Sequence, residues 1–465
     1  MDKLVTIIMP VYNAEQFLKD SISDIRNQTY RFWELICVDD GSTDQSGKIL
    51  TEFQREEERI KVLRQTNKGA ARARNSAMKY ITGEYVLFLD ADDRFRPDLL
   101  EKAVMRADCL KTDILLFDAE CFDHETGQKL PGEWLVMRDK LPAQKVFCFQ
   151  DFPENIFLFS HSVPWNKLYR TKFLRENEIV FQEIPFEEDV VFVSMANIKA
   201  EKLSFLDEPL VKYRQNNHAS LTGKIVRQKY PMCVYDAMEA LRQALVEEGI
   251  YEQVWKGFVN YAAEHFLWNL EVMAGDGYEC LYAKTKEYFR DIVQVGRMEA
   301  ADFIRDDLHQ KIKRLCQYDQ REYLFFLLQD KRQVIEKINK DFAGLLEYTE
   351  KLKKNLEFIK SNRKWIFESK KVPAGSRIIL YGAGEVGRDY FAQFKREGCY
   401  HLVAWVDRNY KEMTGGFHIE APEKIPEYEW DYVIIAACNP EIVRDIHGKL
   451  NSMGISDSRI EQMFL

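Results

Sequence analysis

Short apolar runs alternate with helical patterns over residues 1 to 125, and this alternation restricts the fold more than any other feature. Apolar residues recur at helical spacing over 14–28 and 70–80. Strands that alternate with helices are typical of a mostly parallel sheet covered by helices. The sequence therefore predicts an α/β fold, with strands over 4–9, 35–38, 60–63, 85–89 and 113–118.

Three carboxylates follow one of these strands directly, in the stretch EYVLFLDADDRF at 84–95. Asp90, Asp92 and Asp93 cannot all lie unpaired in a closed core, because isolated buried charges are too costly. One interpretation is an acidic turn that caps the next helix. The other is a metal site at the carboxyl end of a strand, where open α/β sheets bind their ligands.

Further polar loops lie at or next to the carboxyl ends of the predicted strands. The segment NKGAARARNSA opens a helix with cations near its start, which suits a phosphate. The segment IPFEEDVVFVSMA places Glu187, Glu188 and Asp189 at the start of an apolar helix, where acids either cap the helix or supply a base. Four loops lie at or next to the carboxyl ends of predicted strands and can therefore converge: PVYNAE at 10–15, VDDGSTD at 38–44, NKGAARARNSA at 67–77 and the acids at 90–93.

Length and charge bound the class of protein. A chain of 465 residues is long enough for two or three domains, and its net charge of -9 argues against a nucleic-acid binder. The nine cysteines form no Cys-x-x-Cys pair, so we expect a reduced, cytoplasmic protein. No apolar run approaches the length of a membrane span or a signal-peptide core.

Residues 228 to 365 are helical in pattern, and one stretch carries a heptad-like seam. The seam either packs on its own domain or forms a coiled coil with a second copy, which would give a homodimer. Eight Lys or Arg lie between 351 and 371, around Trp365, Ile366 and Phe367, and predict peripheral contact with the inner face of a membrane; a solvated linker helix is the alternative. The seam consists of Ile335, Ile338, Phe342, Leu345, Thr349, Leu352, Leu356 and Ile359.

A dinucleotide-binding fingerprint follows the linker 370–376. An apolar strand runs into Gly382-x-Gly384-x-x-Gly387 and a helix, and the next strand ends at Asp407. Glycines in this context suit a pyrophosphate, and the acid suits a ribose hydroxyl, so a nucleotide or NAD is the predicted ligand. Asp407 could equally do no more than end a strand.

The first 225 residues resemble family 2 inverting glycosyltransferases of the GT-A fold, the bacterial type that builds surface polysaccharides. The resemblance implies a nucleotide-sugar donor, usually a UDP-sugar, a glycan or lipid-linked acceptor, and Mn²⁺ or Mg²⁺. It is carried by IIMPVYNAEQFL, VDDGSTD, NKGAARARN, FLDADD, VPWNKLYR, FEEDVVF and YRQNNHASLT, in that order.

The resemblance also implies roles for individual residues. Asp189 would be the catalytic base, Asp92 a metal ligand, and His218 a further metal or diphosphate contact. Trp165 and Asn166 would form the acceptor-side wall, with core packing as the alternative. The donor would be bound by Pro10, Tyr12, Glu15, Asp40, Lys68, Arg74, Asp90, Ala91 and Glu188.

The chain is thus predicted to hold a GT-A catalytic domain over 1–225, a helical region over 226–370 and a small Rossmann-like domain over 376–465. The last resembles the sugar-nucleotide-binding domains that precede some bacterial sugar acyltransferases. Two alternatives to a transferase rest on this domain. It could make the protein an NAD-dependent sugar-nucleotide oxidoreductase, or it could be a non-catalytic module that binds a nucleotide or a partner.

Overall fold

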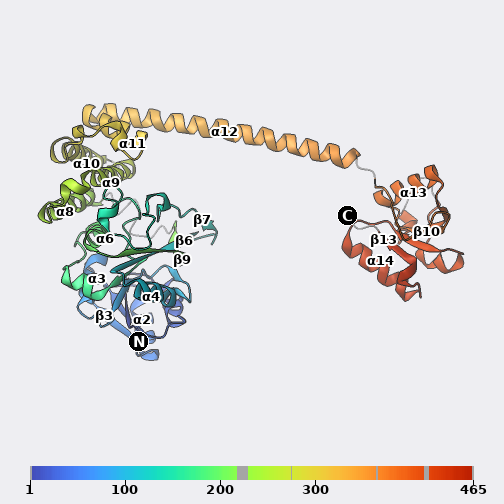
Figure 1. Ribbon diagram of the computed structural model, residues 1–465, viewed down its shortest axis with the longest axis horizontal. Coiled ribbons are helices and arrows are strands. Elements are labelled where there is room, and N and C mark those ends of the chain that lie inside the picture. Colours follow the sequence, from blue (N-terminus) through green and yellow to red (C-terminus); the bar gives the residue numbers. More distant parts are fainter. Residues whose placement is uncertain (1–2, 217–228, 274, 363–364, 413–417, 463–465) are drawn as a thin grey trace. The chain divides into compact units, whose positions relative to one another are not determined.

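The structure is a computed structural model that describes residues 3–216, 229–273, 275–362, 365–412 and 418–462, without the side chains of 352 and 354–362. The chain divides into two compact units, Met1–Asp330 and Lys331–Leu465. The predicted boundary at 225 falls outside the described residues and stays a prediction, as does His218. Figure 1 labels the elements of each unit.

The first unit is built on a large sheet with strand order β3-β2-β1-β4-β8-β6-β9-β5. The first four of these strands are parallel, as predicted, and their residues are almost all buried except in β3. A run such as Tyr85–Phe88 is apolar throughout because both faces of a parallel sheet are covered. These strands are β1 (Val5–Val11), β2 (Trp33–Asp39), β3 (Ile60–Arg64) and β4 (Tyr85–Phe88).

The other half of this sheet is mixed. β8 pairs antiparallel with both β4 and β6, and the long β9 runs parallel to β6. No strand was predicted for residues 125–225, a stretch of mixed pattern that is rich in aromatic residues. The strands are β5 (Arg94–Phe95), β6 (Ile114–Asp123), β7 (Lys129–Leu130), β8 (Lys167–Arg170) and β9 (Leu203–Gln215).

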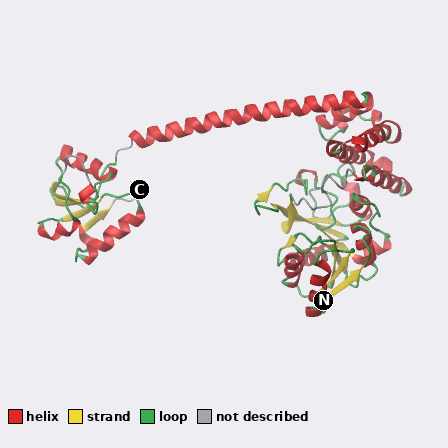
Figure 2. Ribbon diagram, turned by 180° about the vertical axis from the view of Figure 1, so that it is seen from behind, coloured by secondary structure: helices red, strands yellow, loops and turns green. Residues whose placement is uncertain are grey.

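Helices cover the sheet, as Figure 2 shows in red. The helix predicted over 14–28 begins only at Leu18, because the backbone N–H groups of Ala14 and Glu15 donate to Ser46 at the start of the next helix and to Asp44 just before it. The helices described in this part of the chain are α1 (Leu18–Arg26), α2 (Ser46–Glu56), α3 (Ala70–Met78), α4 (Leu99–Leu110), α5 (Thr171–Glu176) and α6 (Glu188–Lys199).

The predicted helical region packs onto the same core. Buried residues from Val5 to Leu327 form one continuous hydrophobic cluster that includes the inner faces of these helices. The helical region therefore contributes to the environment of the sheet. Its helices are α8 (Cys233–Glu247), α9 (Tyr251–Val272), α10 (Gly275–Glu287) and α11 (Asp306–Gln317).

The predicted seam lies on α12 (Gln320–Asn362), a single helix of 43 residues. Ile335, Ile338, Phe342 and Leu345 are all exposed on it. None of the helices in the described part of the chain is both long and apolar enough to cross a bilayer.

The second unit holds a small parallel sheet with strand order β11-β10-β12-β13. Its core also takes in Phe367 and Val372, which precede the predicted start at 376, so Phe367 is buried, whereas Ile366 is exposed. The elements are β10 (Arg377–Tyr381), α13 (Glu385–Glu397), β11 (His401–Val406), β12 (Tyr432–Ile435), α14 (Pro440–Ser452) and β13 (Ile460–Gln462).

Candidate active site

Arg74 of α3 connects three of the predicted loops. Its Nη2 donates to Asp90 Oδ1 at 2.8 Å and its Nη1 donates to Glu188 Oε1 at 3.0 Å. The guanidinium is buried and lies over the ring of Phe181. A buried cation needs paired charges, so the loop after β4 and the start of α6 are held together at this edge of the sheet.

Asp189 lies in the first turn of α6, beside this cluster. Burial, together with the charges of Glu188 and Glu187, raises the pKa of Asp189 well above its usual range, although Arg74 opposes the shift. Burial likewise raises the pKa of Glu188, against the effect of Arg74. A carboxylate with a raised pKa is a better proton acceptor near neutral pH, which suits a general base.

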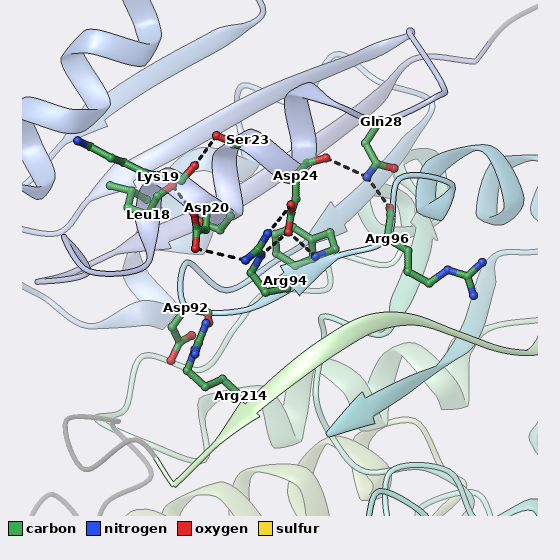
Figure 3. A network of polar contacts seen from close by, with 12 residues as sticks. Leu18, Lys19, Asp20, Ser23, Asp24, Gln28, Asp92, Arg94, Arg96 and Arg214 are labelled. Atoms are coloured by element: carbon green, nitrogen blue, oxygen red, sulfur yellow. Dashed lines mark hydrogen bonds and ion pairs between the residues drawn. The ribbon is translucent and has the colours of Figure 1, made fainter. Parts of the chain in front are cut away.

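The acidic turn after β4 is held by β9. Arg214 donates from its backbone N–H to Asp93 Oδ1 at 2.8 Å, and from Nε to the carbonyl of Asp92 at 2.7 Å. Figure 3 shows the Arg214 guanidinium beside Asp92. Burial and the charges of Asp92 and Asp90 raise the pKa of Asp93 well above its usual range. The buried Asp93 thus stabilises the turn through its hydrogen bond with Arg214, whereas Asp92 is partly exposed.

A second network ties this turn to α1 (Figure 3). Arg94 donates from Nε to Asp24 at 2.6 Å and from Nη1 to Asp20 at 3.2 Å. Gln28 reaches the carbonyl of Arg96 at 2.6 Å. The strand β5, which follows the acidic turn, is therefore bound to α1 through Arg94, and the next residue, Arg96, is bound by Gln28.

The residues at this turn fit a divalent cation that is shared with a phosphate ligand. Within the described residues, no group of three or more His, Cys, Asp or Glu side chains could hold a metal alone. Mg²⁺ is usually bound through one or two carboxylates plus substrate phosphates, so one or two acids at the turn are a sufficient protein contribution. Asp93 Oδ2 is buried and has no hydrogen-bond partner among the described residues, so the turn holds an unsatisfied oxygen next to Asp92.

The loops after β1 and β2 bind one another. Asp40 is buried, and its carboxylate accepts hydrogen bonds from Gln65 Nε2 and from the backbone N–H groups of Lys68 and Gly69, at 2.7–2.9 Å. Glu15 accepts from the N–H of Gln45 at 2.8 Å. Asp40 therefore shapes the start of α3, and one of its acceptor sites remains for a ligand.

The other predicted donor contacts lie around these loops. Pro10 is partly buried within β1, and Tyr12 follows the end of that strand with an exposed side chain. Ala91 is buried within the acidic turn, whereas the side chain of Lys68 is exposed. Their roles stay predictions.

Trp165 and Asn166 are both buried, which favours packing over direct contact with an acceptor. The Trp165 ring stacks on Tyr213 with centroids 4.9 Å apart. Asn166 Oδ1 accepts from Lys167 Nζ at 2.8 Å, and the same ammonium donates to the carbonyls of His161 and Val163. Burial lowers the pKa of Lys167 to about 7.

Sequence reasoning did not single out Arg214 or Lys167. Both lie inside motifs quoted above, YRQNNHASLT and VPWNKLYR. For Lys167 the available signal was a cation among the apolar residues of VPWNKLYR, because a buried Lys needs oxygen partners; the polar motif YRQNNHASLT gave no such signal for Arg214.

The glycine-rich loop of the second unit has the geometry of its fingerprint. A Cβ at Gly387 would lie 1.9 Å from the carbonyl oxygen of Gly382, whereas one at Gly384 would meet nothing within 4 Å. The Asp407 carboxylate accepts from the N–H groups of Ala383 and Asn409, at 2.7 and 2.8 Å. Asp407 therefore shapes the loop, and its predicted contact with a ribose stays a prediction.

Two family models match parts of this chain. The family model "Glycosyl transferase family 2" matches residues 6–177, and the model "C2185-like, N-terminal" matches 374–461. EpsH, a glycosyltransferase of Bacillus subtilis (strain 168), is 31% identical over 45% of this chain and 60% of its own length. The chain thus spans less than two thirds of that relative.

Two further relatives carry names from cell-wall polymer synthesis. TuaG of B. subtilis, named for teichuronic acid biosynthesis, is 44% identical over 51% of this chain and 89% of its own length. TarS of Staphylococcus aureus, a poly(ribitol-phosphate) beta-N-acetylglucosaminyltransferase, is 29% identical over 55% of this chain and 43% of its own. A solved structure of TarS residues 1–349 with UDP-GlcNAc superposes with a TM-score of 0.48, at 22% identity, over 66% of this chain and 90% of that one. Because TuaG is matched over nearly its whole length, the chain belongs to glycosyl transferase family 2.

Proposed function

We propose that this family 2 glycosyltransferase moves a sugar from a nucleotide-sugar, most simply a UDP-sugar, to a hydroxyl of a cell-surface glycan, polymer or lipid-linked acceptor, with inversion at the anomeric carbon. The contact that carries the proposal is Arg74, which joins Asp90 to Glu188 and so brings the base-bearing turn to the acidic turn. The names of TuaG and TarS support a cell-wall polymer as the acceptor.

The residues around this cluster have different proposed roles. Asp189 takes the proton of the acceptor hydroxyl, whose oxygen attacks the anomeric carbon from the side opposite the diphosphate. A positioned base of this kind contributes about 10²–10⁴-fold. Asp40 bonds the base of the nucleotide, Asp90 lies at its ribose, and Arg74 keeps the two acidic turns at a fixed separation.

A divalent cation, Mn²⁺ or Mg²⁺, would be held by Asp92 together with the donor diphosphate, and His218 is proposed as a further contact. When bound, it neutralises the charge that develops on the leaving diphosphate. Asp93 and Arg214 keep the Asp92 backbone in place for it.

Titration calorimetry of UDP with and without Mn²⁺ tests the donor site. We expect UDP to bind more tightly with the metal, and Asp92→Asn to lose that gain. Asp20→Asn is a matched control, because Asp20 is exposed on α1 and binds Arg94 instead. Uridine nucleotides that bind no better with metal would contradict the proposal.

We also propose that the chain forms a homodimer through α12. The exposed apolar positions Ile335, Ile338, Phe342 and Leu345 follow the alternating steps of three and four that a coiled coil requires. A second copy offers the same stripe, and most homo-oligomers are two-fold dimers.

The place of action is proposed to be the cytoplasm, at the inner face of the membrane. Because Phe367 is buried in the second unit, the contact would rest on the basic residues of 351–371 and on the exposed Ile366. Co-migration with anionic liposomes at low salt is expected, and its absence would rule the contact out.

The second unit is proposed to be a non-catalytic module that binds a nucleotide or a partner. The open space at Gly384, at the start of α13, supports a ligand there. The NAD-dependent oxidoreductase is not favoured, because the family assignment accounts for the first unit without a redox step. Thermal shift with NAD, UDP and UDP-sugars tests the module.

A further inference from the structure

One face of α9 contacts the sheet-bearing part of the first unit on successive turns, at residues 257, 261, 265 and 269. At Gly257 the helix backbone comes so close that a Cβ would lie 2.5 Å from the carbonyl oxygen of Glu154. Only glycine allows this approach. The three side chains that follow on the face bind Glu187, just before α6, and Ser162, in the segment before Trp165.

His265 and Asn269 bind the residue that precedes α6. His265 Nδ1 lies 3.1 Å from Glu187 Oε2, and Asn269 Nδ2 donates to Glu187 Oε1 at 3.2 Å. The Glu187 side chain is only 8% exposed. Because a carboxylate accepts at both oxygens, both are bound by α9, and the His265 nitrogen that faces it carries the proton.

The backbone of Glu187 needs such support. Its φ of 62° lies in the left-handed region, which is unfavourable for a residue with a side chain. Conformations of this kind persist only where the surroundings hold them, and they gather at functional sites. Glu187 stands two positions before Asp189, so its conformation sets where the first turn of α6 begins.

Tyr261 binds the loop that leads to Trp165. Its hydroxyl is hydrogen-bonded to Ser162 Oγ, three residues before Trp165, and its ring contacts the His265 ring with centroids 4.4 Å apart. Neighbouring turns of one helix thus hold the base-bearing turn and the segment that leads to Trp165 and Asn166.

The geometry points to α9 as part of the catalytic centre, with His265 and Asn269 as positioning residues that hold Asp189 in place through Glu187. This inference rests on the proposed role of Asp189 as the base. A base that is displaced by about 1 Å can cost roughly 10²-fold in rate, whereas the nucleotide loops lie on other elements and keep their geometry. The expected signature is a fall in kcat with unchanged affinity for UDP.

The test compares His265→Leu, which keeps most of the volume, with His265→Asn, whose side-chain amide can place an N–H near the position of Nδ1. On the UDP-sugar that the full-length wild type hydrolyses fastest, we expect His265→Leu to lower kcat by about 10-fold or more. The UDP Kd should stay within about 2-fold, and His265→Asn should recover most of the turnover. His309→Leu is the matched control, because His309 packs on Phe303 within the helical region.

A second measurement shows whether His265 acts through Glu187. In the Glu187→Ala background, His265→Leu should lower kcat no further, because the contact is already lost. An active wild type with His265→Leu at full kcat, or full additivity of the two changes, overturns the inference alone. A wild type that binds no uridine nucleotide and hydrolyses no nucleotide-sugar overturns the proposed function and, with it, this inference.

Discussion

Arg74 and Asp90 form an ion pair in which Nη2 of the buried guanidinium lies 2.8 Å from Oδ1 of the partly exposed carboxylate. The same guanidinium binds Glu188 at 3.0 Å, so one cation balances two carboxylates. Removal of a buried partner leaves uncompensated charge, so Arg74→Met should lower the free energy of unfolding by about 3–5 kcal/mol. Urea unfolding at neutral pH measures this.

The control for that change lies two residues away. Arg72 pairs with Glu183 at 2.6 Å, but both side chains are nearly half exposed. Exposed pairs contribute about 0–1 kcal/mol, so Arg72→Met should barely change stability. Equal losses of unfolding free energy in the two variants would contradict a larger contribution of Arg74 to stability.

The pH dependence of turnover should report the neighbours of Asp189. Burial, Glu188 and Glu187 raise its pKa, and only the ionised form accepts a proton, so kcat should rise with pH through the raised pKa. Glu188→Gln removes a negative charge, favours ionisation and should move this acid limb to lower pH. Glu183→Gln, at an exposed site, should leave it in place. A shift of the limb to higher pH in Glu188→Gln would contradict the electrostatic account.

The α12 seam predicts the oligomeric state. Light scattering of the full-length protein at micromolar concentration should give a dimer. Ile338→Glu places a charge in the apolar stripe and should give a monomer, whereas Lys340→Glu, off the stripe, should stay dimeric. A monomeric wild type rules the coiled coil out.

Two glycines of the second unit should differ in their response to the same substitution. Gly387→Ala would force a Cβ to within 1.9 Å of the Gly382 carbonyl oxygen, and overpacking of this kind costs about 1–3 kcal/mol or more. Gly384→Ala meets open space and should leave the melting temperature of the full-length protein unchanged. Equal melting temperatures for the two variants would contradict the close approach.

Much of this arrangement could be predicted because local patterns fix it. The parallel strands β1 to β4 are short, mostly apolar stretches between helical patterns, and the acids at their carboxyl ends must meet at one edge of the sheet. The antiparallel β8 and the long β9 could not be predicted, since their pairing depends on contacts between distant segments.

The contacts that α9 makes with Glu187 could not be predicted from the sequence either. His265 and Glu187 are 78 positions apart, and an isolated His on an amphipathic helix carries no sign of its partner. Only the glycine at 257, inside a helical pattern, marked a close approach, and that signal does not say to what.

The central claim is that Asp189 is the base of a nucleotide-sugar transferase. The most direct measurement is turnover of UDP-, GDP- and dTDP-sugars with Mn²⁺ by the wild type and by Asp189→Asn, alongside UDP affinity of both. The account predicts that the wild type turns over a UDP-sugar, and that Asp189→Asn binds UDP nearly as well but loses about 10²–10⁴-fold in kcat. Retention of most of the turnover by Asp189→Asn would contradict it.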